Sequence, residues 1–184
     1  MLTTVFVILL LVIVAVLGLA AMKPDVFRVR READIAAPPE KIFPLLNDFR
    51  QWALWSPWEK MDPAMTRNYA GADNGKGAVY AWEGNKKVGQ GRMEIVEATP
   101  PDRLAIKLDF LKPFESHNTT VFTLEGKSDS TRVTWDMHGP ATFMVKLMHV
   151  FMDMDKMVGK DFERGLANLK TEAENQPLSL QDRA

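Results

Sequence analysis

Residues 154–173, MDKMVGKDFERGLANLKTEA, carry one long apolar stripe around which the rest of the chain must be organised. The stripe comprises Val158, Phe162, Leu166, Leu169 and Ala173, at spacings of four, four, three and four residues. Such spacing places all five side chains on one face of an α-helix. The pattern predicts a long C-terminal helix that must bury this face against another apolar surface.

Residues 66–139 are predicted to supply that surface as about six antiparallel strands. Apolar and polar residues alternate clearly at Leu104, Ile106, Leu108 and Phe110, and again at Val133, Trp135 and Met137. Asn74-Gly75 and Gly84-Asn85 are typical of tight turns between strands. A further strand is expected over residues 27–35, where Arg31 interrupts the apolar face, and two short helices should follow it. This order predicts an α+β fold in which a curved sheet of about seven strands wraps around the C-terminal helix.

The N-terminal segment has the composition of a membrane span. Residues 5–22 contain no charge and no amide, and the uncharged run from residue 2 to residue 22 would extend over ~31 Å as a helix, close to the ~30 Å of a bilayer core. We expect a signal-anchor helix in residues 1–24, a folded domain in 25–175 and a polar tail in 176–184. A cleaved signal peptide, with Gly18-Leu19-Ala20 as its cleavage site, is the alternative.

Basic residues near this span favour a cytoplasmic location for the domain. Lys23, Arg28, Arg30 and Arg31 all follow the span, and positive residues prefer the cytoplasmic side. The opposite side stays open, because the three arginines lie in a predicted strand and their charge can serve the fold.

Composition excludes several classes of function. The chain has no cysteine, so thiol nucleophiles and Cys-ligated metals are excluded. With 23 Lys and Arg against 24 Asp and Glu, it lacks the basic surplus of nucleic-acid-binding proteins. The three histidines, His117, His138 and His149, have no metal-ligand spacing. We therefore predict no metal, no cofactor and no catalytic residue. Asp136 and His138 should point outward, and Asp109 is expected to be solvated.

Four stretches resemble the START-like (SRPBCC) superfamily, in particular its polyketide cyclase/dehydrase and lipid transport branch. They are IAAPPEKIFPLLNDFRQWALWSPW at 35–58, GKGAVYAWEGNKKVGQGRMEI at 75–95, TRVTWDM at 131–137 and MDKMVGKDFERGLANLK at 154–170. The resemblance implies a helix-grip fold with a hydrophobic cavity between the sheet and the C-terminal helix. In this superfamily such cavities hold lipids, sterols and polyketides.

Large apolar side chains are abundant enough to line such a cavity. We take as candidate lining residues Trp52, Trp55, Tyr80, Trp82, Met93, Phe110, Trp135, Met154, Met157 and Val158. Ordinary core packing is the alternative for each of them, because a tryptophan buries ~150–250 Å² in either role.

The predicted function is a membrane-tethered binding or carrier protein for an apolar small molecule or lipid. Its alternatives are a cyclase or dehydratase acting on a polyketide-like substrate, and an interaction module with a packed interior.

Overall fold

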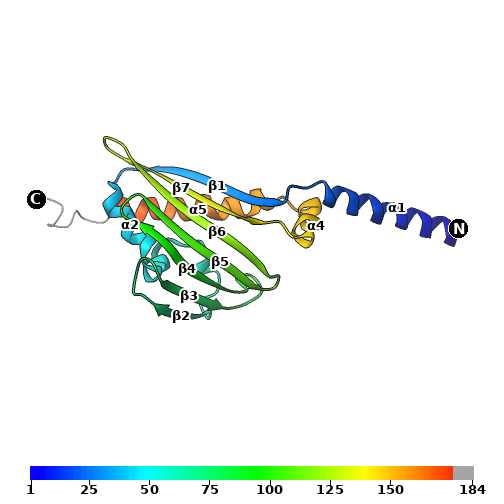
Figure 1. Ribbon diagram of the computed structural model, residues 1–184, viewed down its shortest axis with the longest axis horizontal. Helices are drawn as coiled ribbons and strands as arrows, with labels where there is room; N and C mark the ends of the chain where they lie inside the picture. The colour runs from blue at the N-terminus through cyan, green and yellow to red at the C-terminus, as the bar shows by residue number, and fades with distance from the viewer. Residues whose placement is uncertain (176–184) are drawn as a thin grey trace, which may run out of the picture.

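The computed structural model describes residues 1–175 and contains a seven-stranded antiparallel sheet whose concave face is covered by helices (Figure 1). The strands are β1 Val26–Ile35, β2 Thr66–Gly71, β3 Ala78–Glu83, β4 Gln90–Thr99, β5 Arg103–Lys112, β6 Ser116–Gly126 and β7 Thr131–Pro140. Their order across the sheet is β1-β7-β6-β5-β4-β3-β2. The predicted α+β fold with about seven strands is confirmed. The predicted polar tail, 176–184, lies outside the described residues.

Within residues 1–175, five α-helices and two short 3₁₀ turns complete the fold. They are α1 Leu2–Ala21, α2 Pro39–Asn47, η1 Phe49–Gln51, α3 Trp52–Trp55, η2 Pro57–Lys60, α4 Phe143–Phe151 and α5 Met154–Asn175. Helix α2 begins with a proline in its first turn, where no N–H is needed, and it also accommodates Pro44 in its interior.

Helix α5 turns its predicted stripe toward the sheet. Phe162, Leu166, Leu169 and Ala173 are each at most 2% exposed, and Val158 is half-buried. They join a single core with the inward side chains of the strands and with α2 and α3. Burying a side chain of this size contributes about 1.5–3 kcal/mol, so the helix is held mainly by this face.

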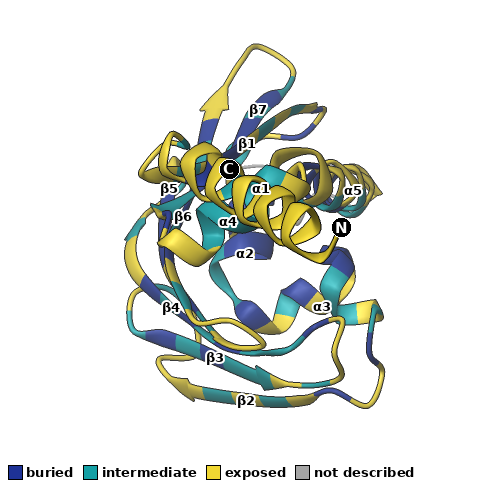
Figure 2. Cartoon of the chain, turned by 90° about the vertical axis from the view of Figure 1, so that its right-hand side faces the viewer, coloured by how far each residue is buried: buried dark blue, intermediate teal, exposed yellow. Residues whose placement is uncertain are grey.

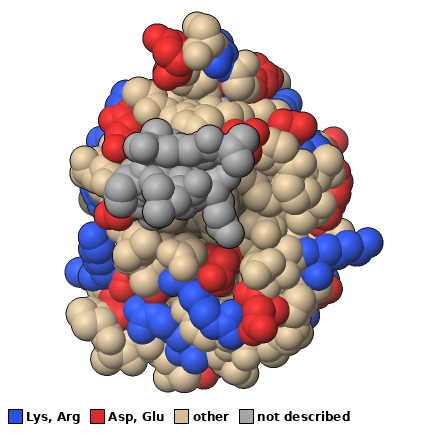
Figure 3. Space-filling view, turned by 90° about the vertical axis from the view of Figure 1, so that its left-hand side faces the viewer, with Lys and Arg blue, Asp and Glu red and all other residues tan. Residues whose placement is uncertain are grey.

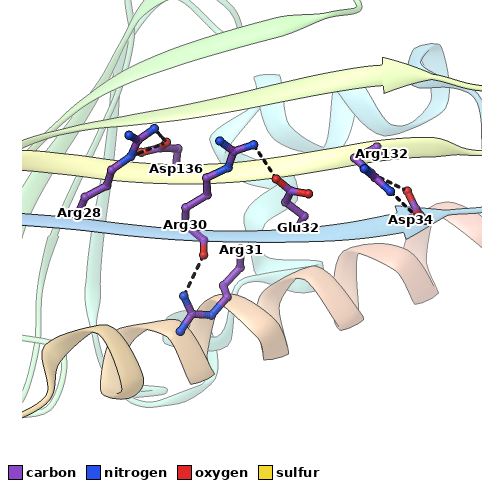
Figure 4. A network of polar contacts seen from close by, with 7 residues as sticks. All are labelled: Arg28, Arg30, Arg31, Glu32, Asp34, Arg132 and Asp136. Carbon is purple, nitrogen blue, oxygen red and sulfur yellow. Dashed lines mark hydrogen bonds and ion pairs between the residues drawn. The ribbon is translucent and has the colours of Figure 1, made fainter.

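Arg31 is the polar residue that interrupts the apolar pattern of β1, and the structure explains it. Its guanidinium reaches α5, where Nη1 lies 3.0 Å from an Asp155 carboxylate oxygen and Nε lies 2.8 Å from Glu163. Figure 4 shows Arg31 pointing toward α5 while Arg28 and Arg30 extend on the other side of β1. Gly159 leaves the space that the guanidinium occupies beside the helix backbone. Arg31 therefore links the edge strand to the first turns of the helix.

Helix α1 extends away from the domain at the end where α4 lies (Figure 1). It is long and apolar enough to span a membrane, with a mean hydropathy of 3.1 in its central window. Only Ala20 is buried, and α4 is its main neighbour. In Figure 2 the exposed surface of α1 contrasts with the buried segments of the sheet behind it.

Candidate functional site

The concave face of the sheet carries a cluster of stacked aromatic rings. Trp135 on β7 stacks on Phe162 of α5 with ring centroids 4.0 Å apart and planes inclined by 10°. Phe122 lies 4.9 Å from Trp135 on one side, and Trp55 meets it edge-on at 5.5 Å. Gly165 of α5 permits this approach, because a Cβ there would lie 2.8 Å from the Trp135 ring. This part of the grip is filled by side chains.

Three candidate lining residues, Trp52, Trp55 and Trp135, lie in this filled region and are at most 4% exposed. The indole N–H groups of Trp52 and Trp55 donate to the carbonyls of Leu46 and Leu45, at 3.0 and 2.9 Å. These hydrogen bonds satisfy polar groups that would otherwise be costly to bury. In this conformation the three tryptophans pack as core, and their contact with a ligand stays a prediction.

A second set of candidates lines the end of the grip nearest α1. Trp82, Phe110, Met154 and Val158 are half-buried there, and Met157 is 48% exposed. Trp82 meets Phe110 edge-on with centroids 5.9 Å apart. Its ring covers Gly91, where any Cβ would lie 2.4 Å from the indole. We call the four half-buried apolar side chains at this end, Trp82, Phe110, Met154 and Val158, the grip mouth. Met157 instead lines a hollow on the exposed face of α5.

Tyr80 and Met93 lie between the mouth and the filled region. They are opposite each other on β3 and β4, with 3% and 7% exposure. Tyr80 stacks on Tyr69 of β2 at 5.1 Å and on Trp82 at 5.9 Å. Nine of the ten candidates therefore form two groups joined by this pair, and Met157 lies apart on the exposed side of α5.

Within the grip, a polar cluster surrounds Glu59 of η2, whose side chain is 7% exposed. The Tyr80 hydroxyl donates to one carboxylate oxygen at 2.5 Å, and Arg67 Nε donates to the other at 2.6 Å. Burial, and then the hydrogen bond to Glu59, raise the pKa of Tyr80, so this phenol stays protonated. Sequence reasoning missed Glu59 and Arg67. Alternation on β2 could have placed Arg67 on the inward face, but no spacing signal connects η2 to that strand.

Two buried polar atoms on the same face have no protein partner. They are the Trp135 indole nitrogen and the Thr120 hydroxyl oxygen. Phe122 pairs directly with Trp135, and Thr120 lies two residues before Phe122, so the two side chains are diagonal neighbours. Buried polar groups are nearly always hydrogen-bonded, so these two atoms are unsatisfied polar groups on the concave face.

Two surface hollows lie outside the grip. The first, of about 300 Å³, lies on the outer face of the sheet and is lined by Arg28, Arg103, Asp136 and His138 among others. Arg28 donates from Nε to Asp136 at 2.9 Å. Burial raises the pKa of Asp136, but the hydrogen bond and charge of Arg28, together with His138, lower it overall. The predicted outward direction of Asp136 and His138 is confirmed. The second hollow, of about 380 Å³, lies against the exposed face of α5.

The prediction that Asp109 is solvated is wrong. It lies on the outer face of the sheet but is only 8% exposed, because His117 Nδ1 lies 2.7 Å and Lys107 Nζ 3.1 Å from its carboxylate. Long neighbouring side chains cover it. Alternation indicated the face correctly but carried no information about this cover.

Charge on the rest of the surface is mixed. At the end of the domain opposite α1, Lys and Arg are interspersed with Asp and Glu (Figure 3). Among residues 1–175, no group of three or more His, Asp or Glu side chains is arranged to hold a metal ion. Neither of the two hollows described above lies within the grip.

Several solved structures share this fold. A protein from Mesorhizobium loti, MLL2253, has a TM-score of 0.61 at 15% identity over 83% of this chain and 100% of its own. The protein CV1439 from Chromobacterium violaceum has a TM-score of 0.58 at 16% identity over 84% of this chain and 100% of its own. The di-domain ARO/CYC BexL, from the BE-7585A biosynthetic pathway, has a TM-score of 0.60 at 16% identity, over 87% of this chain and 54% of its own.

Comparison at the level of sequence identifies the family. No curated protein matches the chain. The model of the family described as polyketide cyclase / dehydrase and lipid transport matches residues 26–174, which include every strand, the aromatic cluster, the grip mouth and the Glu59 cluster. This chain therefore belongs to the polyketide cyclase/dehydrase and lipid transport family.

Proposed function

We propose that the chain is a membrane-tethered binding or carrier protein that holds a hydrophobic small molecule or lipid between the sheet and α5. The observation that carries the proposal is the grip mouth, where apolar side chains of β3, β5 and α5 remain half-buried instead of being sealed like the rest of the core. Ligand sites are typically concave and apolar, with a few polar groups that fix orientation. The mouth provides the apolar surface, and the unpartnered atoms of Trp135 and Thr120 provide the polar groups deeper inside.

The tether is α1, whose length and composition match a bilayer core. A helix that is almost entirely exposed cannot be a core helix of this domain, because its apolar surface would face water. A cleaved signal sequence has similar properties. Intact mass of the chain recovered from membranes distinguishes the two, since cleavage at Gly18–Ala20 would remove most of α1.

Binding can be tested with the full chain in detergent micelles and a fluorescent fatty acid as probe. Phe110→Glu places a carboxylate in the mouth, where an apolar ligand would desolvate it. Leu54→Glu is the matched control, because Leu54 is also a large apolar residue, is 42% exposed, and lies on α3 away from the mouth. We expect Phe110→Glu to weaken probe binding by at least about tenfold, equivalent to ~1.4 kcal/mol, and Leu54→Glu to leave it unchanged. Equal affinities for both variants and the wild type would refute binding through the mouth.

A second function is favoured by the Glu59 cluster. The Tyr80 hydroxyl donates its single proton to Glu59 in this conformation. If it turned from Glu59 to a bound substrate, it would donate that hydrogen bond to a carbonyl that becomes negatively charged, as cyclisation or dehydration of a polyketide-like substrate requires. Tyr80→Phe removes the hydroxyl while keeping the ring. If the chain is an enzyme of this kind, Tyr80→Phe should lower turnover of a poly-β-keto thioester by about 10²-fold or more while the fatty-acid probe still binds. A carrier would show binding and no turnover in either form.

A further inference from the structure

Exposed apolar side chains of the domain gather at one end. Outside α1, the large apolar residues that are at least 40% exposed in the described chain are Met22, Val26, Leu54, Val96, Leu111, Phe114, Phe143, Met144, Phe151, Met152 and Met157. All but Leu54 and Val96 lie at the end of the domain where α1 joins it: on or just after α4, at the end of β5 and the turn that follows it, just before or at the start of β1, or in the first turns of α5. Antiparallel pairing places the start of β1, the end of β7 and the β5–β6 turn at the same end of the sheet.

Helix α4 contributes the largest share of this surface. None of its residues is buried, although it is strongly apolar. Phe143, Met144 and Phe151 are 52%, 52% and 70% exposed, and their spacing of seven and eight residues places them on one helical face. Met152, 42% exposed, follows directly after the helix. This set of four residues, the α4 face, is an apolar surface that the rest of the domain does not cover.

The opposite side of α4 is fixed to the domain by specific contacts. Lys146 forms an ion pair with Asp25, and the His149 ring packs on Phe27 with centroids 5.5 Å apart. The Thr142 side chain caps the helix by accepting from the Val145 N–H. Because these contacts face inward, the α4 face is directed away from the sheet.

The position of α1 indicates what covers the α4 face. Along α1, Val16 is half-buried and Ala20 is buried, whereas the other positions are exposed, and α4 is the main element that α1 contacts. Both positions lie within the last five residues before Ala21, so at ~1.5 Å per residue α4 touches α1 within ~8 Å of its C-terminal end. The polar layer on each side of a bilayer core is ~5–8 Å deep. If α1 spans the membrane, its last ~8 Å lie at the edge of the hydrocarbon core, and α4 must therefore lie at the boundary between the core and the headgroups.

Basic residues occur at the same end. Lys23 follows α1 directly, and Lys86 and Lys87 lie in the turn between β3 and β4, which contacts the end of β5 at Gly89. Lysines beside an apolar helix favour a surface that contains anionic lipid. The combination of exposed aromatic and methionine side chains with nearby lysines is typical of interfacial helices.

We infer that the α4 face is a membrane-docking surface that lies in the interfacial layer of the bilayer in which α1 is inserted. This inference rests on the proposed membrane tether. Docking would hold the grip mouth toward the bilayer, because Trp82 at the end of β3 and Phe110 at the end of β5 lie at the same end of the sheet as α4. An apolar ligand could then pass between the bilayer and the grip without crossing bulk water.

The absence of cysteine in the chain makes a direct test possible, since a single introduced cysteine can be labelled without background. The full chain is reconstituted into phosphatidylcholine vesicles containing phosphatidylglycerol, with an NBD label at Met144→Cys or Phe151→Cys. Val12→Cys, in the middle of α1, reports insertion of the span. Val96→Cys is the matched control, because Val96 is 40% exposed but belongs to the distant part of β4. Lipids that carry a quencher near the headgroup or deep in the acyl chain measure the depth of each label.

We expect labels at positions 144 and 151 to lose about half of their fluorescence with the shallow quencher, because an interfacial helix buries its apolar face ~5–10 Å into the headgroup boundary. The label at position 12 should respond to the deep quencher, and the label at 96 to neither. Quenching at 12 without quenching at 144 and 151 would overturn docking while leaving the tether intact. Absence of quenching at 12 would overturn the tether and docking together. A blue shift at 144 and 151 without lipid quenching would indicate that protein, such as a second copy, covers the α4 face, and would also overturn the inference.

Discussion

Gly165 of α5 provides a quantitative test of how tightly the helix is gripped. A Cβ at this position would lie 2.8 Å from Cζ3 of Trp135 and 3.3 Å from Cδ of Pro57. Carbon atoms pack favourably at ~3.5–4.0 Å, so Gly165→Ala requires the indole to move by roughly 1 Å. The indole has no free direction, because Phe162 stacks on it at 4.0 Å and Phe122 lies 4.9 Å away.

The magnitude follows from two opposing effects. Alanine is better than glycine in a helix interior by about 1 kcal/mol, whereas forcing extra volume into a packed core costs about 1–3 kcal/mol. We expect Gly165→Ala to lower the free energy of unfolding by about 1 kcal/mol. Gly159→Ala is the matched substitution in the same helix, and there the nearest atom belongs to the end of the flexible Arg31 side chain, at 1.9 Å. Arg31 can swing aside and lose only partly exposed ion pairs, so Gly159→Ala should be close to neutral.

The measurement is urea denaturation of the full chain in micelles, followed by far-ultraviolet circular dichroism of each variant. Combining Gly165→Ala with Trp135→Phe, which shortens the ring, should reduce the cost of the alanine to below about 0.5 kcal/mol if the two residues are coupled. If Gly165→Ala is as stable as Gly159→Ala, or if the double variant shows simple additivity, the tight contact between Trp135 and α5 is refuted.

Three further predictions concern the edge of the sheet, its outer face and the orientation of the chain. Arg31→Met removes both ion pairs to α5 and should cost roughly 1 kcal/mol at low salt and less at 1 M NaCl, as measured by denaturation, because the carboxylate partners are largely exposed. The hydrogen bond to Asp109 raises the pKa of His117 above 6.5, so the pair stabilises the fold at low pH and this stabilisation is lost as pH rises through the raised pKa. Denaturation midpoints measured from pH 5 to 9 should therefore decline, and the decline should be smaller in His117→Gln. If the domain is cytoplasmic, a fluorescent protein fused after Ala184 should fluoresce, whereas alkaline phosphatase fused at the same place should be inactive. The reverse pattern would refute that orientation.

The strands and the long helix could be predicted from sequence because burial on one face produces periodic patterns. Alternation at Val133, Trp135 and Met137 on β7 indicated inward side chains, and the structure buries all three. The α5 stripe was equally clear. Arg31 interrupts the apolar pattern of β1, and its role could not be predicted. Its partners Asp155 and Glu163 are more than 120 residues away in the sequence, and no local rule connects them to Arg31.

The division of the grip into a filled region around Trp135 and a half-buried mouth around Trp82 could not be predicted in the same way. Trp82 and Trp135 have the same residue type and the same inward direction, yet Trp135 is 3% exposed and Trp82 is half-buried. The difference depends on which helix covers each strand. Trp135 lies beneath α5 at Gly165, whereas Trp82 lies at the end of a strand near the opposite edge of the sheet. Periodicity reports the direction of a side chain but not the packing that covers it.

This division also limits the path by which a ligand can enter. Entry beside Trp135 would require Phe162 and Phe122 to separate from a ring stacked at 4.0 and 4.9 Å, and each such aromatic pair adds ~0.5–1.5 kcal/mol to the ordinary benefit of burial. Entry beside Trp82 and Phe110 displaces side chains that are already in contact with solvent. If the chain binds an apolar ligand as proposed, the ligand should therefore enter through the mouth. A ligand that enters with its polar group first would bring this group toward the unpartnered atoms of Trp135 and Thr120. The apolar part of the ligand would then remain at the membrane end of the grip.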